Sequence, residues 1–300
     1  MNVINHPHTV RADMEGNCRR CQIPAQISSS SSSSSAPMEE AHGESQWVRQ
    51  ALTDDWLFCL FHSIVHADTG QVFGHEALIR ARHPHTGEVY GAGPIIDAAN
   101  KLDMHHILDQ KARKTAIREA ALLREMRGRI FINFMPNTIY DPEICLRTTM
   151  EAAHEYGVPL SRLVFEVVET EQIPDMKKLE RILDYYRRHG VGTAVDDMGA
   201  GYASVEYLAA LQPDFVKIDR DLVVRAELEK EARQKMDLVV SQAKSLGIAV
   251  IAEGIETPEQ LHLCREAGTD FLQGYLFGIP ANPPALSLDE LGIFPGVASG

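Results

Sequence analysis

The sequence predicts an α/β barrel of the TIM (β/α)8 type, modified by an antiparallel pairing of its first strand. Two observations predict this fold. From Trp56 onward, eight short apolar runs alternate with amphipathic helical patterns, which is typical of a parallel sheet with helical crossovers. The alternating region spans about 240 residues, a length that suits a closed barrel better than an open doubly wound sheet.

The predicted strands are rich in valine, isoleucine and phenylalanine, and polar or turn-forming residues bound them. They are Trp56–Ala67, Val72–Ala81, Arg129–Pro136, Leu163–Glu169, Gly192–Met198, Phe215–Arg220, Ala249–Ile255 and Phe271–Phe277. Only Asp68–Gly70 and a few neighbours separate the first two strands, which is too short for a parallel crossover. This pair should therefore form an antiparallel hairpin.

Helical patterns between the strands are clearest over Asp109–Met126, Met176–Gly190 and Lys230–Gly247. The last two stop at a glycine, as helix C-termini often do. These segments supply the crossovers that a parallel barrel requires.

Residues 1–46 differ in composition from the rest. The serine run Ser28–Ser35 buries too little apolar surface to offset its conformational entropy, so 1–46 is predicted to be a disordered tail or linker and 47–300 a single domain. Cys18 and Cys21, with His6 and His8 upstream, could hold zinc or act as a redox pair. We favour the tail interpretation, because no second Cys-x-x-Cys accompanies the first.

The composition excludes several function classes. A net charge of -13 disfavours coating of DNA or RNA and of anionic lipid. No apolar run approaches the roughly 20 residues of a membrane span, and no secretory signal is evident, so we expect a cytoplasmic protein without a membrane partner. Five cysteines do not suggest a disulfide framework, and Cys59, Cys145 and Cys264 are predicted to be buried thiols.

Polar side chains occur late in nearly every predicted strand, where barrel enzymes carry their active sites. They are Glu76, Asn133, Glu166, Glu169, Asp196, Asp197, Lys217, Glu253 and Gln273. Burying this many acidic groups near one another is unfavourable unless cations neutralise their charge. A divalent-metal site is therefore the first hypothesis. In isolation, the Asp196–Asp197 pair would be more typical of a turn, and Lys217 with Glu253 could form a purely structural ion pair.

Glu76-Ala77-Leu78 with Arg80 resembles the signature of the EAL domain, a family of phosphodiesterases that linearise cyclic di-GMP. Further segments resemble the family pattern in the same order: INFMP, FEVVET, DDMGAGYAS, KIDR, AEGIET and LQGYLFG. The resemblance covers roughly Trp56 to Pro280, and it implies that 47–300 is an EAL phosphodiesterase domain.

The resemblance also implies roles for individual residues. The ligands of two Mg²⁺ or Mn²⁺ ions would be Glu76, Asn133, Glu166, Asp196 and Asp197, all hard oxygen donors of the kind these ions prefer. Lys217 and Glu253 would be catalytic. Leu78, Arg80 and Gln273 would contact the substrate, and Glu169 would anchor a loop.

The implied activity is metal-dependent hydrolysis of cyclic di-GMP to linear pGpG, and with it a part in controlling biofilm formation or motility. The alternatives are a catalytically silent cyclic di-GMP receptor that signals to a protein partner, and an interaction module that binds no nucleotide. A homodimer is implied by the resemblance, and an unknown partner could bind the N-terminal tail.

The histidines, including His62 and His75, lack zinc-type spacing, and we expect no function for them.

Overall fold

The computed structural model of the chain describes residues 36–123, 125–136, 142–168, 176–199 and 205–284. Within these residues, nine strands form one sheet in the order β1-β9-β8-β7-β6-β5-β4-β2-β3. They are β1 (Leu57–His66), β2 (Val72–Arg82), β3 (Val89–Tyr90), β4 (Arg129–Phe134), β5 (Leu163–Val168), β6 (Gly192–Met198), β7 (Phe215–Ile218), β8 (Ala249–Ala252) and β9 (Phe271–Gln273). Because β1 pairs with both β9 and β2, all the strands except β3 close into a barrel. The predicted barrel is confirmed.

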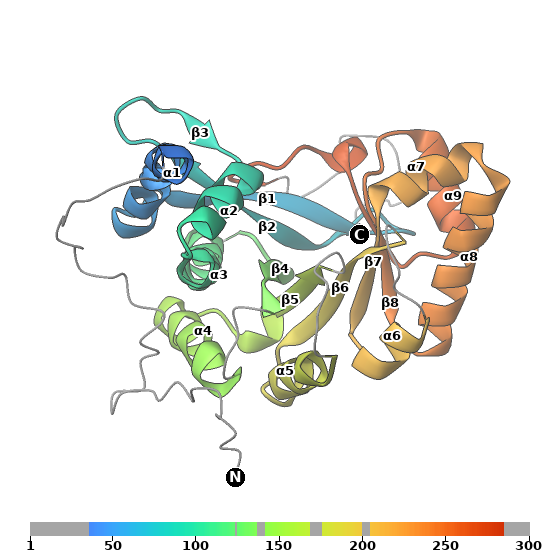
Figure 1. The fold of residues 1–300 in the computed structure, drawn as a ribbon. Helices are drawn as coiled ribbons and strands as arrows, with labels where there is room; N and C mark the ends of the chain where they lie inside the picture. The colour runs from blue at the N-terminus through green and yellow to red at the C-terminus, as the bar shows by residue number, and fades with distance from the viewer. Residues whose placement is uncertain (1–35, 124, 137–141, 169–175, 200–204, 285–300) are drawn as a thin grey trace, which may run out of the picture.

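Helices surround the barrel, as Figure 1 shows. They are α1 (Ala36–Thr53), α2 (Ala92–Lys101), α3 (His105–Leu122), α4 (Pro142–Tyr156), α5 (Met176–Arg188), α6 (Val205–Leu211), α7 (Arg220–Leu228), α8 (Lys230–Ser245) and α9 (Pro258–Ala267), with short 3-10 turns at Leu160–Arg162 and Tyr275–Phe277. The three helices expected from the sequence correspond to α3, α5 and α8, with ends that differ by a few residues. Among the described helices there is no candidate for a membrane span.

The direction of β1 is the modification predicted from the short connection at Asp68–Gly70. It runs antiparallel to β2 over nearly its whole length, with His62 opposite Glu76, and antiparallel to β9 through Ile64–His66. The pairs from β2–β4 round to β8–β9 are parallel. The carboxyl ends of the parallel strands therefore meet at one end of the barrel.

The barrel interior is built in two layers. The lower layer is an apolar cluster of Ile64, Phe131, Val164, Ala194, Phe215, Ile251 and Phe271. Side chains two residues apart on a strand point to the same face. The next inward position on each of these strands is therefore His62, Asn133, Glu166, Asp196, Lys217, Glu253 or Gln273. A packed apolar floor thus supports a polar upper layer.

Two larger cores lie outside the lumen. One fills the space between the strands and α3–α9, and the other joins α1, α2 and the start of α3 to the outer part of the β1–β2 hairpin. Cys59 and Cys264 are buried thiols as predicted, whereas the side chain of Cys145 lies outside the described part.

Helix α1 crosses the boundary that was predicted between residues 46 and 47. α1 begins at Ala36, inside the segment 1–46 that was assigned to a disordered tail. Its second half has apolar residues at helical spacing, and Val48, Ala51 and Leu52 are buried against α2. This packing gives the helix the tertiary support that composition alone did not reveal. The prediction for residues 1–35 lies outside the described residues.

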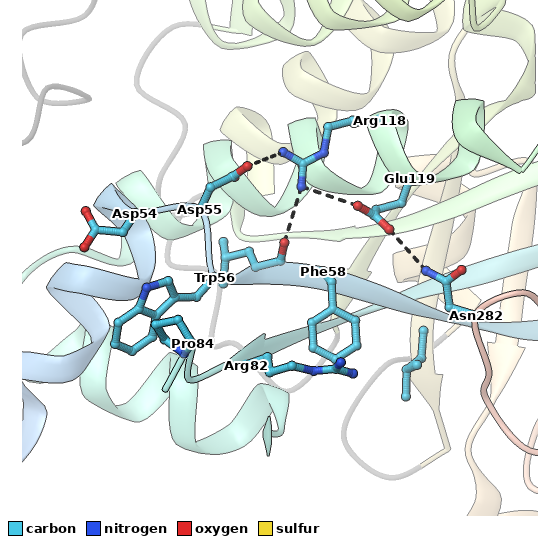
Figure 2. A pocket seen from close by; sticks show the side chains of 11 residues that line it. Asp54, Asp55, Trp56, Phe58, Arg82, Pro84, Arg118, Glu119 and Asn282 are labelled. Carbon is cyan, nitrogen blue, oxygen red and sulfur yellow. Dashed lines mark hydrogen bonds and ion pairs between the residues drawn. The ribbon is translucent and has the colours of Figure 1, made fainter. Parts of the chain in front are cut away.

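β9 pairs only with Ile64–His66 of β1, so among the described residues the edge of β1 from Leu57 to Ser63 has no neighbouring strand on that side. Side chains and one short bridge cover this edge. Phe61 exchanges two backbone hydrogen bonds with Ala281, and the amide of Asn282 donates to the carbonyl of Cys59 at 3.0 Å. Arg118 of α3 donates to the carbonyl of Leu57 at 3.4 Å. Figure 2 shows Arg118, Glu119 and Asn282 linked along this edge, beside a cavity of about 520 Å³. An edge covered in this way is a poor template for another strand.

Candidate functional site

The polar upper layer of the lumen gathers at the carboxyl ends of the parallel strands. Glu166 and Lys217 are almost inaccessible to solvent, with exposed fractions of 0% and 1%. The packed phenylalanines below prevent these side chains from reaching water through the barrel. Their charges must therefore be balanced within the layer itself or by ions bound there.

Lys217 lies at the centre of this layer and contacts carboxylates from four different strands or strand ends. Its Nζ is 2.6 Å from Glu253 Oε1, 3.1 Å from Glu166 Oε1, 3.4 Å from Glu76 Oε2 and 3.4 Å from Asp196 Oδ1. One ammonium group therefore holds four carboxylates that face one another across the lumen.

The pKa values of the cluster follow from this arrangement. Burial alone would lower the pKa of Lys217, but the surrounding carboxylates outweigh it and raise the pKa well above its ordinary value. Burial raises the pKa of Glu166 well above its ordinary range, and Glu76, Asp196 and Glu253 raise it further while Lys217 lowers it in part. Burial likewise raises the pKa of Glu253 and of Asp196, with Lys217 again opposing.

Glu76 behaves differently from the other carboxylates. Asn133 Nδ2 donates to its Oε1 at 2.9 Å, and Gln273 Nε2 donates to its Oε2 at 2.8 Å. Burial tends to raise the pKa of Glu76, but Lys217 and these two amides together lower it below the ordinary value. Both oxygens are thereby fixed in orientation, with the ionised form favoured.

The end of β6 is irregular where the two neighbouring aspartates lie. The register with β7 shifts between Val195 and Met198, and Asp197 adopts a positive φ of 59°. The Asp197 amide donates to Asp196 Oδ1 at 2.9 Å. This bulge directs both carboxylates toward the same region, because oxygens of Asp196, Asp197 and Glu253 lie within 4.8 Å of one another.

These residues fit a divalent cation. The carboxylates of the cluster are Glu76, Glu166, Asp196, Asp197 and Glu253, and Lys217 supplies a single positive charge among them. Among the described residues, no hydrogen-bond donor reaches the buried Oε2 of Glu166. Excess negative charge, an unsatisfied oxygen and hard oxygen donors are together what Mg²⁺ or Mn²⁺ would satisfy.

A cavity of about 530 Å³ opens above the cluster. Predicted site residues that line it are Glu76, Leu78, Arg80, Asp196, Lys217, Glu253 and Gln273. The Arg80 guanidinium donates to the carbonyl of Ile79 at 2.8 Å through one nitrogen. Asn133, Glu166 and Asp197 join the cluster through the contacts above, and Glu169 lies outside the described residues.

His62 is a residue of this cavity that the sequence analysis dismissed. Its ring lies on the inner face of β1 opposite Glu76, and it packs against Tyr275 with ring centroids 5.9 Å apart. No partner among the described residues reaches its Nε2, and burial is the main cause of its lowered pKa. The signal that could have identified it is its spacing of two residues from Ile64, which points inward.

Arg220, Glu256 and Tyr275 also line the cavity without having been singled out. Arg220 and Glu256 form an ion pair of 2.8 Å across the ends of β7 and β8. Gly254 lies beneath this pair with a φ of +66°, and a Cβ there would lie 2.1 Å from Arg220 Cγ. The absence of a side chain at Gly254 therefore lets Arg220 cover the rim.

Comparisons with known proteins found similar chains. The family model described as "EAL domain" matches residues 45–280. The chain is 30% identical over 246 residues to the cyclic di-GMP phosphodiesterase NbdA of Pseudomonas aeruginosa, covering 81% of this chain and 31% of that protein. It is 31% identical over 246 residues to the cyclic di-GMP phosphodiesterase PdeL of Escherichia coli, covering 80% and 63%. The chain thus spans less than two thirds of the length of these relatives.

A solved structure is similar in both sequence and fold. It is the cyclic di-GMP-bound form of a standalone EAL protein from Vibrio cholerae, with a TM-score of 0.69 and 35% identity, covering 75% of this chain and 92% of that one. The similarity includes the barrel that carries the acidic cluster.

Proposed function

The chain belongs to the EAL domain family, and from this premise we propose that it hydrolyses cyclic di-GMP to linear pGpG with the help of two divalent metal ions. The observation that carries the proposal is the ring of carboxylates around Lys217 beneath an open cavity. Two relatives that are about 30% identical to this chain over the aligned 246 residues are cyclic di-GMP phosphodiesterases.

Electrostatics explain why the proposal includes metal ions. A phosphodiester is anionic, and the four carboxylates at the base of the cavity would repel it, because Lys217 supplies only one positive charge among them. Mg²⁺ or Mn²⁺ held by Glu76, Asn133, Glu166, Asp196 and Asp197 would reverse this charge and supply the Lewis acidity that activates water and stabilises the leaving oxygen. The two amides on Glu76 keep its carboxylate ionised and oriented for this task.

Glu253 and Lys217 are the proposed catalytic pair. The raised pKa of Glu253 makes its carboxylate a stronger base than an ordinary glutamate, as acceptance of a proton from an attacking water requires. Lys217, at 2.6 Å, fixes the position of that carboxylate and offsets the charge that develops on the phosphate. In the reaction, the water oxygen would bond to phosphorus and pass one proton to Glu253, while one ester P–O bond breaks and the leaving ribose oxygen takes up a proton, which leaves pGpG.

Substrate contacts are assigned to the cavity wall. Arg80 uses one guanidinium nitrogen on the Ile79 carbonyl, so its other donors can bind a phosphate. Gln273 donates to Glu76, while its Oε1 has no partner among the described residues and can accept a hydrogen bond from guanine. Leu78 supplies apolar contact. Glu169 as a loop anchor and the homodimer stay predictions of the family resemblance. A partner for the N-terminal segment and a cytoplasmic location stay predictions from the sequence.

The experiment is turnover of cyclic di-GMP by the purified chain with MgCl₂, with MnCl₂ and with EDTA, with pGpG followed by chromatography. Glu76→Gln tests the site, and Glu88→Gln, at an exposed position in the connection between β2 and β3, is the matched control. We expect product from the wild type and Glu88→Gln with either ion, and none with EDTA or from Glu76→Gln. Tight binding of cyclic di-GMP without product would favour a receptor, and no binding at all would favour an interaction module.

A further inference from the structure

β2 and β4 separate toward the active-site end of the barrel. Their parallel pairing ends at Ala77 and Ile132, although β2 continues to Arg82 and β4 to Phe134. Outside the barrel at this point, α2 and α3 pass over the two strands and enclose a cavity of about 400 Å³. Ala77 and Ile79, which point away from the lumen, line this cavity together with Leu78 and Asn133 at the gap between the strands.

Small side chains account for the empty space. Ala77 of β2, Ala92 of α2, and Ala112 and Ala116 of α3 all line the cavity. Protein interiors are normally packed so closely that voids larger than a water molecule are few. A space of this size falls within the range of sites that bind small molecules.

The cavity also lies at the boundary between the two hydrophobic cores outside the lumen. Cys59, Ile132 and Phe134 on its walls belong to the core of the barrel, whereas Leu108 belongs to the core that holds α1 and α2. Neither core fills the space between them.

The polar groups of the wall are already paired or uncharged. Asp109 Oδ1 accepts the backbone N–H of Met135 at 3.0 Å, and its Oδ2 accepts Arg113 at 2.7 Å. Burial raises the pKa of the Cys59 thiol to about 12, so this group stays protonated. A cavity with such walls offers a ligand apolar contact and no unpaired charge.

Access to the cavity is from the helix side. Ala116, Ile132 and Phe134 at its floor are buried, while Ala92 and Ala112 at its rim are only half-buried. A small molecule can therefore reach the floor between α2 and α3 without unfolding the barrel.

We propose that this cavity, which adjoins the cavity above Lys217, is a binding site for a small uncharged apolar molecule, such as a substituted aromatic compound. An anionic ligand is disfavoured because the wall contains no free cation. The two cavities share a wall, because Leu78 lines both of them and Asn133 lines this one. A ligand in it would contact the residues that flank Glu76 and Asn133 in the sequence.

The test is a titration of the full chain with the neutral fluorescent probe N-phenyl-1-naphthylamine, in EDTA and without nucleotide. Ala112→Leu and Ala92→Leu place extra carbons in the cavity from its half-buried rim, where they cause little strain. Ala209→Leu, at an exposed position of α6, adds the same apolar surface elsewhere. Thermal unfolding identifies any variant that does not fold, and the second rim variant then replaces it.

We expect saturable binding to the wild type and to Ala209→Leu, with affinity at least tenfold lower in the rim variants. Absence of saturable binding to the wild type would overturn the proposal. Equal affinity in a folded rim variant and the wild type would also overturn it, because the probe would then be bound elsewhere.

Discussion

Lys217 Nζ lies closer to Glu253 Oε1, at 2.6 Å, than to any other carboxylate of the cluster. The lysine thus combines two tasks. It orients the one carboxylate proposed to take a proton, and it is the internal cation that allows the remaining acids to be buried together.

The first prediction concerns this second task. Lys217→Met keeps the length of the side chain but removes the charge, which leaves the carboxylates buried without a cation. In EDTA at pH 7 we expect the free energy of unfolding to fall by about 3–5 kcal/mol, the usual cost of breaking a buried ion pair. Urea denaturation measures this, with Lys230→Met at an exposed position as the control. A loss equal to that of the control would show that the ammonium group is dispensable.

The second prediction is the pH dependence of stability without metal. Glu166, Glu253 and Asp196 have raised pKa values in the folded chain, so the folded state holds protons that the unfolded state has released. Stability must therefore fall as the pH rises above the ordinary carboxyl range. The pKa of Glu76 is lowered, so its contribution to the stability of the folded chain is lost only at more acid pH. Lys217, whose pKa is raised, stays charged throughout.

In EDTA, we expect the free energy of unfolding to decrease from pH 5 to pH 8, by no more than about 1.4 kcal/mol per pH unit for each titrating carboxyl. Saturating Mn²⁺ should weaken or reverse the trend, because the ion binds the deprotonated groups. Urea titrations at four pH values test this. A flat or rising profile in EDTA would contradict the predicted direction.

Sequence patterns predicted the strands and the inward polar positions because apolar alternation along a strand is a local signal. Phe215 and Lys217 illustrate this, because residues two apart on one strand point to the same face. Phe215 therefore belongs to the apolar lower layer of the lumen and Lys217 to the polar layer above it. The position of His62 in the cavity was missed because the histidines were judged only by the spacing of zinc ligands. Asp109 was missed because its partner Met135 is remote in the sequence, and such contacts depend on how helices pack.

The third prediction concerns the buried pair of Asp109 and Arg113. Both side chains are almost inaccessible, and Arg113 also donates to Thr149 of α4 at 3.0 Å. Arg113→Met leaves Asp109 buried without its cation, so we expect a loss of about 3–5 kcal/mol in the free energy of unfolding. Adding Asp109→Asn should recover part of this loss, because a neutral amide is less costly to bury. Additive losses in the double variant would argue against coupling.

The fourth prediction concerns the amide that holds Glu76. Gln273→Leu removes the donor to Oε2 at 2.8 Å and leaves Asn133 in place. If Glu76 binds a metal ion, loss of this partner should weaken Mn²⁺ binding about 10- to 100-fold. Calorimetric titration with Mn²⁺ in the absence of nucleotide measures the effect, with exposed Gln234→Leu as the control. Unchanged Mn²⁺ affinity would separate Gln273 from the metal site.

The last prediction concerns the covered edge of β1. Arg118→Met removes the donor to the Leu57 carbonyl and the 2.7 Å ion pair with Asp55, and Asn282→Ala removes the donor to the Cys59 carbonyl. Because Arg118 and Asp55 are partly exposed, the pair should contribute at most about 1 kcal/mol to stability. The larger effect of removing these side chains should be on association, since an uncovered edge of β1 can pair with a strand of another molecule. We expect the double variant to scatter more light with rising protein concentration, whereas Arg225→Met, which removes an exposed ion pair on α7, should not. If the two behaved alike, side-chain covering of β1 would not be what keeps this edge from pairing.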